Sequence, residues 1–127
     1  MIRVTCAIIL HDDRVLVTQR SGKMKMPLKW EFPGGKVEAG EKDETCLHRE
    51  LKEELNITVR ILERMEEQRF SYPEFDITLV PFLVRYIQGE IILLEHNTYR
   101  WLTRNDLTGL DWAEADIPVL EEFLSRG

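Results

Sequence analysis

The chain has 127 residues, of which 43% are hydrophobic and 31% are charged, and its formal net charge at pH 7 is -6. This length suits one folding unit with its own core, so we expect a single domain over residues 1–127. An acidic chain is poorly suited to duplex nucleic acid, which requires a basic surface. No apolar run approaches the ~20 residues of a membrane span, so neither duplex nucleic acid nor a membrane is an expected partner.

The two cysteines, Cys6 and Cys46, have no spacing typical of a disulfide framework or a metal site. We expect both to be small buried hydrophobic residues. The apolar run that follows Arg3 is too short for a signal peptide. The sequence therefore favours a reduced, cytoplasmic setting.

The N-terminal third alternates apolar and polar residues, which predicts β-strands, the first two of them paired as a hairpin. It leads to two adjacent glycines, which permit positive φ and close backbone approach. The expected elements are a strand over residues 1–10, a turn at 11–13, a strand over 14–20, a basic loop over 21–29 and a short strand over 36–38.

The stretch Gly34–Ile57 predicts a helix with two distinct faces. An apolar stripe that can pack on a core is formed by Leu47, Leu51 and Leu55. Glu50, Glu53 and Glu54 fall together on a different arc of the helical wheel. Like charges at these spacings repel each other, and a divalent cation that prefers oxygen ligands would offset that cost.

The C-terminal half predicts more strands and one further helix. Pro81 within a strong strand implies an edge position or a bulge, whereas Pro118 stands in the first helical turn, where proline is tolerated. The expected elements are a strand within residues 57–70, a turn at 71–74, a strand over 75–88, a turn at 89–90, a polar loop at 95–97, a strand over 98–102, a helical turn over 103–107 and a helix over 116–124. This order favours an α+β fold with a mixed sheet between helices.

The glycines and the acidic helix together resemble the Nudix box. The residues that carry the resemblance are, in order, Gly35, Glu41, Arg49, Glu50, Leu51, Glu53 and Glu54. Asn56 stands where the box usually has glycine, and Asn is the next best residue for a left-handed helix cap. A solvated helix face is the alternative for the helix alone, but the preceding glycines argue against it. The resemblance implies an α/β/α sandwich and hydrolysis of nucleoside diphosphates linked to another group.

Cleavage of a phosphoanhydride requires charge neutralisation and an activated nucleophile, both of which a bound divalent ion supplies. We expect Mg²⁺ as the cofactor, with Mn²⁺ as a substitute. Glu50 and Glu54 are expected ligands, and the resemblance adds the carbonyl of Gly34. Glu53 is either a further ligand or the partner of Arg49 one turn earlier.

The general base has two candidates, because Nudix enzymes take it either from the box or from a later loop. These candidates are Glu53 and Glu95, and a solvated loop residue is the alternative for Glu95. His96 could titrate near neutrality and is the weaker candidate. Arg49 and Glu50 complete the expected catalytic set.

The phosphate contacts are expected from Arg20, in a setting that resembles MutT-like enzymes, and from Lys36 after the glycines. Surface cations are the alternative for both. Tyr72 and Phe75 are expected to stack on or line the base, or else to pack in the core. The stretch Lys29–Glu38, which also resembles MutT, adds two substrate-binding candidates, Glu31 and Phe32.

Asp116 stands where MutT-like enzymes carry an asparagine that reads the base. An ionised carboxylate only accepts hydrogen bonds, which favours a base edge with donors, as in cytosine or in guanine and 8-oxo-guanine. An N-cap of the final helix is the alternative and is compatible with base contact.

The sequence thus predicts Mg²⁺-dependent hydrolysis of a nucleoside triphosphate to the monophosphate and pyrophosphate. The candidate substrates are 8-oxo-dGTP and CTP/dCTP-type nucleotides, and the protein is expected as a monomer or weak homodimer. One alternative keeps the chemistry and takes ADP-ribose or a dinucleoside polyphosphate. The other is a non-catalytic nucleotide-sensing module, which the complete set of box carboxylates disfavours.

Overall fold

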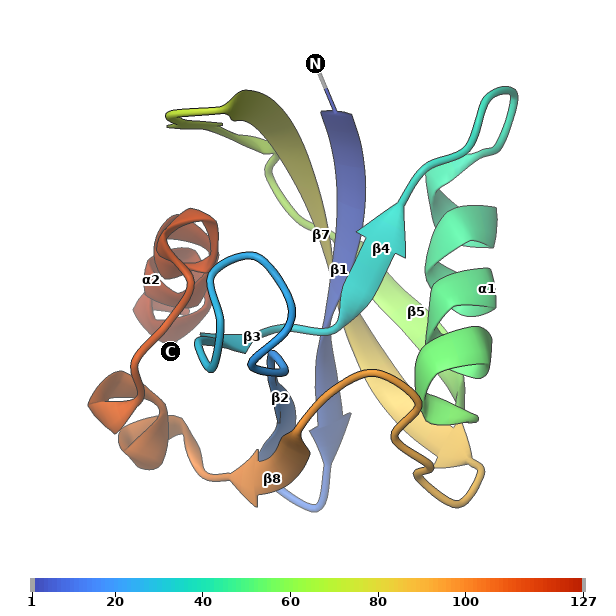
Figure 1. Cartoon of the computed structure of the whole chain (residues 1–127). Coiled ribbons are helices and arrows are strands. Elements are labelled where there is room, and N and C mark those ends of the chain that lie inside the picture. Colours follow the sequence, from blue (N-terminus) through green and yellow to red (C-terminus); the bar gives the residue numbers. More distant parts are fainter. Residues whose placement is uncertain (1, 127) are drawn as a thin grey trace.

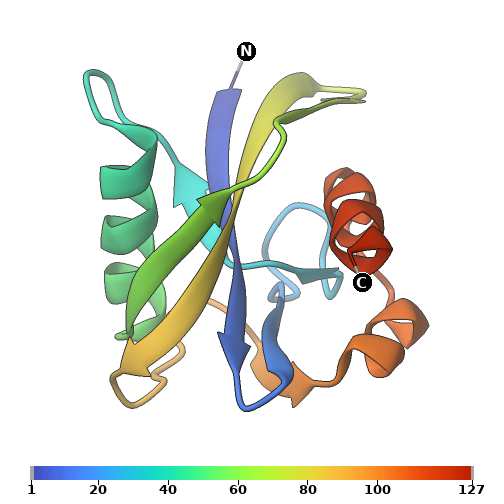
Figure 2. The same ribbon diagram turned by 180° about the vertical axis from the view of Figure 1, so that it is seen from behind.

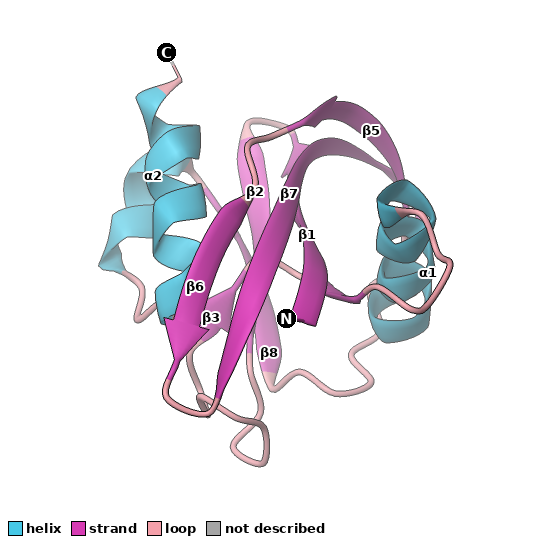
Figure 3. Ribbon diagram, turned by 90° about the horizontal axis from the view of Figure 1, so that it is seen from above, coloured by secondary structure: helices cyan, strands magenta, loops and turns pink. Residues whose placement is uncertain are grey.

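The computed structural model describes residues 2–126, so Met1 and Gly127 lie outside the described residues. A mixed sheet lies between two helices, α1 (Asp43–Leu55) on one face and α2 (Ile117–Ser125) on the other (Figures 1 and 3). The strands are β1 (Ile2–His11), β2 (Arg14–Gln19), β3 (Trp30–Glu31), β4 (Gly34–Lys36), β5 (Thr58–Arg64), β6 (Gln68–Tyr72), β7 (Phe75–Gln88) and β8 (Thr98–Leu102). The predicted α/β/α sandwich is confirmed. Across residues 2–126, no helix has the length and apolarity needed to cross a membrane.

Strands β1 and β7 form the centre of the sheet and are parallel, whereas the other pairings between the named strands are antiparallel. The main strand order is β3-β2-β1-β7-β5, and β4, β6 and β8 pair with β1, β7 and β2 respectively. Figure 2 shows the same sheet from behind, with the helices at its two sides. This arrangement leaves β4 beside the N-terminal half of β1, on the side from which α1 follows.

The strand β1 supplies both cores of the sandwich, because successive side chains of a strand point to opposite faces. Cys6 and Ile8 pack in the cluster that contains residues of α2. Ala7 and Ile9 pack in the cluster that contains the predicted leucine stripe of α1. Both cysteines are buried and free, as the sequence predicted, and burial raises the pKa of each thiol.

The predicted hairpin is confirmed, with His11 opposite Arg14. The two residues of its turn, Asp12 and Asp13, have φ angles of 49° and 63°. Positive φ at both central positions is the geometry that matches the twist of paired strands, and Asp adopts it more readily than most residues.

The expected edge position of Pro81 is wrong, because β7 lies between β1 and β5 in the sheet. The carbonyl oxygen of Pro81 accepts from the N–H of Met65, in the connection between β5 and β6. Proline is therefore tolerated at the point where β7 changes partner from β6 to β5, and the pairing with β5 is irregular nearby, between Ile61 and Glu63.

Several element boundaries differ from the prediction. The segment expected to hold one strand holds β5 and β6, and Trp30–Glu31 forms the short strand β3, which was not foreseen. The strand after the glycines begins at Gly34 itself. The helical turn η1 (Arg104–Gly109) and a second 3₁₀ turn, η2 (Glu114–Asp116), precede α2. Strands of two or three residues carry too little periodicity to be read from sequence.

Helix α1 ends as predicted at Asn56, which is left-handed with φ 61° and ψ 32°. The N–H of Ile57 bonds to the carbonyl of Leu51, and the N–H of Asn56 to that of Lys52. This is the hydrogen-bond pattern of a left-handed helix cap, so asparagine replaces the usual glycine without changing the geometry.

The first turn of α1 is attached to the sheet through Asp43. Its carboxylate accepts from Arg3 at 2.7 and 2.8 Å and from Arg64 at 2.6 Å. The hydrogen bonds from Arg3 are the main cause that lowers the pKa of Asp43 to about 2. Because the folded-state pKa is depressed, this stabilisation is present above about pH 4 and is lost as the pH falls towards 2.

Replacing Asp43 with asparagine is expected to lower the free energy of unfolding at pH 7 by about 1 kcal/mol, because charged hydrogen bonds to partly exposed arginines are lost. The difference from the wild type should shrink as the pH falls from about 4 to about 2. Urea denaturation across this pH range measures it. Glu44→Gln is the matched control, since it removes a charge from the same helical turn at a side chain that is 53% exposed.

Candidate active site

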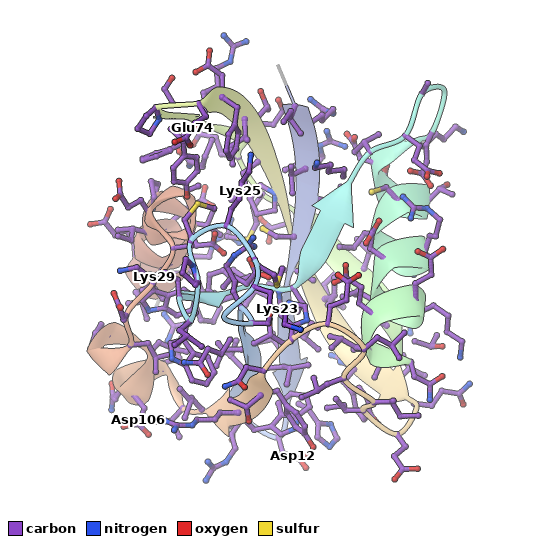
Figure 4. The ribbon with its side chains drawn as sticks, viewed as in Figure 1. Asp12, Lys23, Lys25, Lys29, Glu74 and Asp106 are labelled. Carbon is purple, nitrogen blue, oxygen red and sulfur yellow. The ribbon has the colours of Figure 1, made fainter. Side chains whose placement is uncertain are left out.

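A cavity of about 590 Å³ opens beside the glycine pair at β4. Residues of β1, β7, α1, η2 and the loop over residues 21–29 all contribute to its wall. Figure 4 shows this loop in front of the sheet, with Lys23, Lys25 and Lys29 labelled. The volume is in the range of small-molecule sites, and the wall combines apolar side chains with a few charged ones.

The acidic helix reaches the cavity through two carboxylates, Glu50 and Glu54. Burial is the main cause that raises the pKa of Glu54 to about 8, and the carboxylates of Glu50, Glu95 and Glu31 add to it. An added cation would offset this repulsion and burial. Two carboxylates beside an open cavity suit a hard cation that keeps other oxygen ligands, so the residues present fit a divalent metal ion.

The glycine pair allows this approach. A Cβ at Gly35 would lie 2.2 Å from the carboxylate carbon of Glu50, and a Cβ at Gly34 would lie 2.0 Å from the carbonyl oxygen of Thr5. Only glycine therefore lets β4 lie against β1 on one side and under the Glu50 carboxylate on the other.

Arg49 organises the carboxylates around the helix. It donates to Glu41 at 2.7 and 2.9 Å, to Glu50 at 2.7 Å and to Glu53 at 3.3 Å. The hydrogen bonds from Arg49 are the main cause that lowers the pKa of Glu41 to about 2. Glu53 is 61% exposed and does not line the cavity, so its role as ligand or base stays a prediction.

Within residues 2–126, no three Asp, Glu, His or Cys side chains are grouped closely enough to hold an ion by themselves. The structure brings Glu50 and Glu54 together and turns Glu53 towards Arg49 instead. Of the two readings that the sequence left open for Glu53, the pairing with Arg49 is the one seen here.

Glu31 lies at the centre of the polar wall. One carboxylate oxygen accepts from Arg20 at 2.7 Å, and the other lies 2.8 Å from Nε2 of His96. The negative charge of Glu31 contributes to raising the pKa of two other carboxyl groups of the cavity wall, Glu54 and Asp116. The predicted phosphate ligand Arg20 thus has a carboxylate partner beside the cavity. His96, the weaker candidate base, is buried.

Asp116 is 7% exposed and accepts a hydrogen bond from the N–H of Phe32 at 2.8 Å. It precedes α2 but makes no side-chain capping bond, so the N-cap alternative holds by position only. Burial and then the neighbouring Glu31 raise the pKa of Asp116 well above its usual value. The assumption that this carboxylate is always ionised and only accepts hydrogen bonds is therefore not supported.

The aromatic candidates line the cavity and also pack on each other. The rings of Tyr72 and Phe75 have centroids 5.2 Å apart, and the Tyr72 hydroxyl accepts from the N–H of Ala115. Phe32 packs against Trp112 with centroids 4.7 Å apart. Tyr72 and Phe75 therefore pack on each other while lining the cavity, and their contact with a base stays a prediction.

The cations around the cavity differ in what they contact. Lys36 is exposed at the cavity edge. Lys25, which the sequence did not single out, lies 4.6 Å from the centroid of the Phe75 ring. Together with Met24 and Met26 it brings the basic loop over the cavity. The lysine content of this loop was the only available signal for that placement.

Glu95 is exposed in the loop before β8, and its charge adds to the rise in the pKa of Glu54. The backbone of this loop is bonded to the end of α1, because the N–H of Leu94 bonds to the carbonyl of Glu54 and that of Ile92 to Leu55. Glu53, exposed on the helix, and Glu95, exposed on a loop attached to that helix, therefore both remain candidates for the general base.

Comparison with known proteins places these features in a family. The family profile described as NUDIX domain matches residues 1–123. The CTP pyrophosphohydrolase of Escherichia coli K12 is 34% identical over 125 residues, which cover 98% of this chain and 93% of that protein. The 8-oxo-dGTP diphosphatase of the same organism is 32% identical over 123 residues, which cover 96% of this chain and 95% of that protein.

Solved structures agree with this assignment. The solution structure of the E. coli ORF135 protein superposes with a TM-score of 0.87 at 34% identity, and the match covers 98% of this chain and 89% of that one. Nudix hydrolases generally use divalent metal ions, which agrees with the acidic helix beside the cavity. The profile match and the similarity over nearly the full length show that this chain belongs to the Nudix family.

Proposed function

We propose that this protein is a Mg²⁺-dependent pyrophosphohydrolase that converts a nucleoside triphosphate to the monophosphate and pyrophosphate, with 8-oxo-dGTP or a CTP/dCTP-type nucleotide as substrate. The observation that carries the proposal is the pair of carboxylates, Glu50 and Glu54, beside a cavity of about 590 Å³ whose wall also contains Arg20 and Asp116. The names of the two relatives support both substrate classes.

Glu50 and Glu54 would hold Mg²⁺, with the Gly34 carbonyl and Glu53 as further candidate ligands. The ion, when bound, supplies charge neutralisation and an acidified water. Arg49 holds the Glu50 carboxylate in place through its hydrogen bond. Either Glu53 or Glu95 accepts the proton of the attacking water.

The rest of the cavity binds the nucleotide. Arg20 and Lys36 contact phosphate oxygens, for which a guanidinium fork and an ammonium group are suited. Glu31 and Phe32, which also line the cavity, are further substrate contacts, and Tyr72 and Phe75 present aromatic surface to the base. Asp116 contacts the polar edge of the base, opposite the bond that it makes to Phe32.

A panel of nucleotides tests the proposal. With Mg²⁺ present, pyrophosphate release is expected from 8-oxo-dGTP, CTP or dCTP, and slower release of products from ADP-ribose or diadenosine tetraphosphate. Faster cleavage of the last two would support the alternative substrate class. Tight nucleotide binding without Mg²⁺ and without turnover would instead support the sensing module. Manganese in place of Mg²⁺ gives the matched metal control.

Asp116→Asn is expected to lower kcat/KM for CTP relative to 8-oxo-dGTP by about tenfold, since a lost or mismatched buried hydrogen bond costs about 1–3 kcal/mol. The N–H of Phe32 already occupies one oxygen of Asp116, so an asparagine would keep its oxygen there and turn its NH₂ towards the base. That group cannot accept from the cytosine amino group, whereas it can donate to the O6 acceptor of guanine or 8-oxo-guanine.

The same comparison as a function of pH checks the role of Asp116. Its raised pKa means that the ionised, accepting form grows as the pH increases. The preference of the wild type for CTP should therefore rise with pH, whereas that of Asp116→Asn should stay flat. Parallel pH profiles in the two proteins would remove Asp116 from base recognition.

A further inference from the structure

His96 occupies a position that the proposed chemistry leaves unexplained. Its side chain is 1% exposed, and its Nε2 lies 2.8 Å from a carboxylate oxygen of Glu31. The other oxygen of Glu31 accepts from Arg20 at 2.7 Å. Glu31 is therefore held from two sides by residues far apart in the chain, one on the loop before β8 and one that directly follows β2.

The two nitrogens of the His96 ring have different surroundings. Glu31 accepts from Arg20 and so acts as a carboxylate acceptor, which requires Nε2 of His96 to donate its proton. The other nitrogen, Nδ1, is buried and has no hydrogen-bond partner within residues 2–126. In the neutral ring that nitrogen is an acceptor without a donor, which is less costly than a buried N–H without an acceptor.

A histidine with an unpartnered nitrogen is a poor choice for packing alone. Leaving a buried polar atom unpaired costs about 1–3 kcal/mol, and an apolar side chain of similar size would avoid that cost. Among residues 2–126, the hydrogen-bond partner of the His96 ring is Glu31. The hydrogen bond to Glu31 is therefore the feature that explains a histidine at this position.

The loop that carries His96 is held by backbone hydrogen bonds before and after this residue. Before it, the N–H of Leu94 bonds to the carbonyl of Glu54, and after it, the N–H of Asn97 bonds to the carbonyl of Gln19. Within this loop Ile91 and Leu93 are partly buried against the core on the α1 side, His96 is buried, and its neighbour Glu95 is exposed. The contact between His96 and Glu31 thus links the loop of the candidate base to the wall of the cavity.

We propose that His96 is a positioning residue for hydrolysis, whose Nε2–H fixes the Glu31 carboxylate in the cavity wall and holds the Glu95 loop against that wall. The inference rests on the proposed function, because the step that it supports is the cleavage of a nucleotide in this cavity. His96 itself does not line the cavity, and it acts through Glu31.

Two substitutions separate this role from packing. Glutamine extends an amide N–H towards the place of Nε2, whereas leucine fills the space without a donor. His96→Leu is expected to lower kcat/KM for the best nucleotide of the panel by about tenfold, as expected for a misplaced active-site group. His96→Gln should stay within about threefold of the wild type. His11→Gln is the control, since His11 is 47% exposed and lies at the end of β1.

All variants are compared at a temperature well below their measured Tm, so that loss of folded protein does not enter the rates. A folded His96→Leu with wild-type activity would overturn the proposal. So would a folded His96→Gln that is as impaired as His96→Leu, because the donor would then not matter.

A second measurement does not depend on turnover. Nitrogen NMR of the imidazole in the wild type is expected to show the neutral ring with its proton on Nε2. Glu31→Gln should shift that resonance, whereas Glu95→Gln should leave it in place. A proton on Nδ1 would refute the proposed contact. If the NMR result is as expected and the wild type cleaves no nucleotide, then the proposed function fails while the His96–Glu31 contact stands.

Discussion

Replacing Glu54 with glutamine is expected to lower kcat for nucleotide hydrolysis by about 10³-fold at saturating Mg²⁺, because a bound metal contributes several kcal/mol of transition-state stabilisation. Glu54 lines the cavity with Glu50, and its neighbouring carboxylates disfavour its own charge. Glutamine keeps the shape and removes the charge that would hold the ion. Steady-state pyrophosphate release measures the effect.

The same substitution should stabilise the metal-free protein. The pKa of Glu54 is raised to about 8 from its usual 4.5, so the folded protein loses stability as the pH rises from about 4.5 to about 8. Glutamine cannot ionise and removes this loss. In EDTA at pH 8, Glu54→Gln should therefore have a higher Tm than the wild type. Mg²⁺ should raise the Tm of the wild type and leave that of the variant nearly unchanged.

The control variants carry the same glutamate-to-glutamine change at other positions. Glu44→Gln lies on the same helix, away from the cavity lining, and should retain activity. Glu53→Gln and Glu95→Gln, compared side by side, identify the general base, since the larger fall in kcat belongs to the residue that accepts the proton. Full turnover by Glu54→Gln would contradict the metal assignment.

Gly34→Ala is expected to lower the free energy of unfolding by about 3 kcal/mol, at the upper end for overpacking. Its Cβ would lie 2.0 Å from the carbonyl oxygen of Thr5 and 2.7 Å from Cα of Cys6. Both atoms belong to the backbone of β1, the strand at the centre of the sheet. Side-chain motion cannot relieve that clash, so β4 must separate from β1. Urea denaturation measures the loss.

Gly22→Ala is the matched control, since no described residue beyond its two chain neighbours lies within 4 Å of its added Cβ. It should change stability by less than about 0.5 kcal/mol. Gly35→Ala gives a useful contrast, because its Cβ would meet the flexible carboxylate of Glu50. That variant should fold with modest loss of stability and lose activity. Equal stability of Gly34→Ala and Gly22→Ala would contradict the packing argument.

Much of the fold could be read from local patterns. The leucine stripe of α1, the left-handed Asn56 and the hairpin at Asp12 were predicted because each depends on a few adjacent residues. The Nudix resemblance was confirmed by the family comparison. Pro81 was expected at an edge or a bulge, and the edge position is wrong, since the gap that accepts this proline arises where two other strands, β5 and β6, meet β7.

The sequence by itself determined the acidic helix, its glycine approach and the family, because these features lie within one continuous stretch of chain. Only the tertiary structure decided how the carboxylates are used: Glu54 in the cavity, Glu53 with Arg49, and Asp116 bonded to Phe32. It also decided that His96, 65 residues from Glu31 along the chain, meets it through a buried hydrogen bond. The physical reason is that burial and charge at each position depend on residues distant in sequence, and these set both hydrogen-bond partners and pKa values.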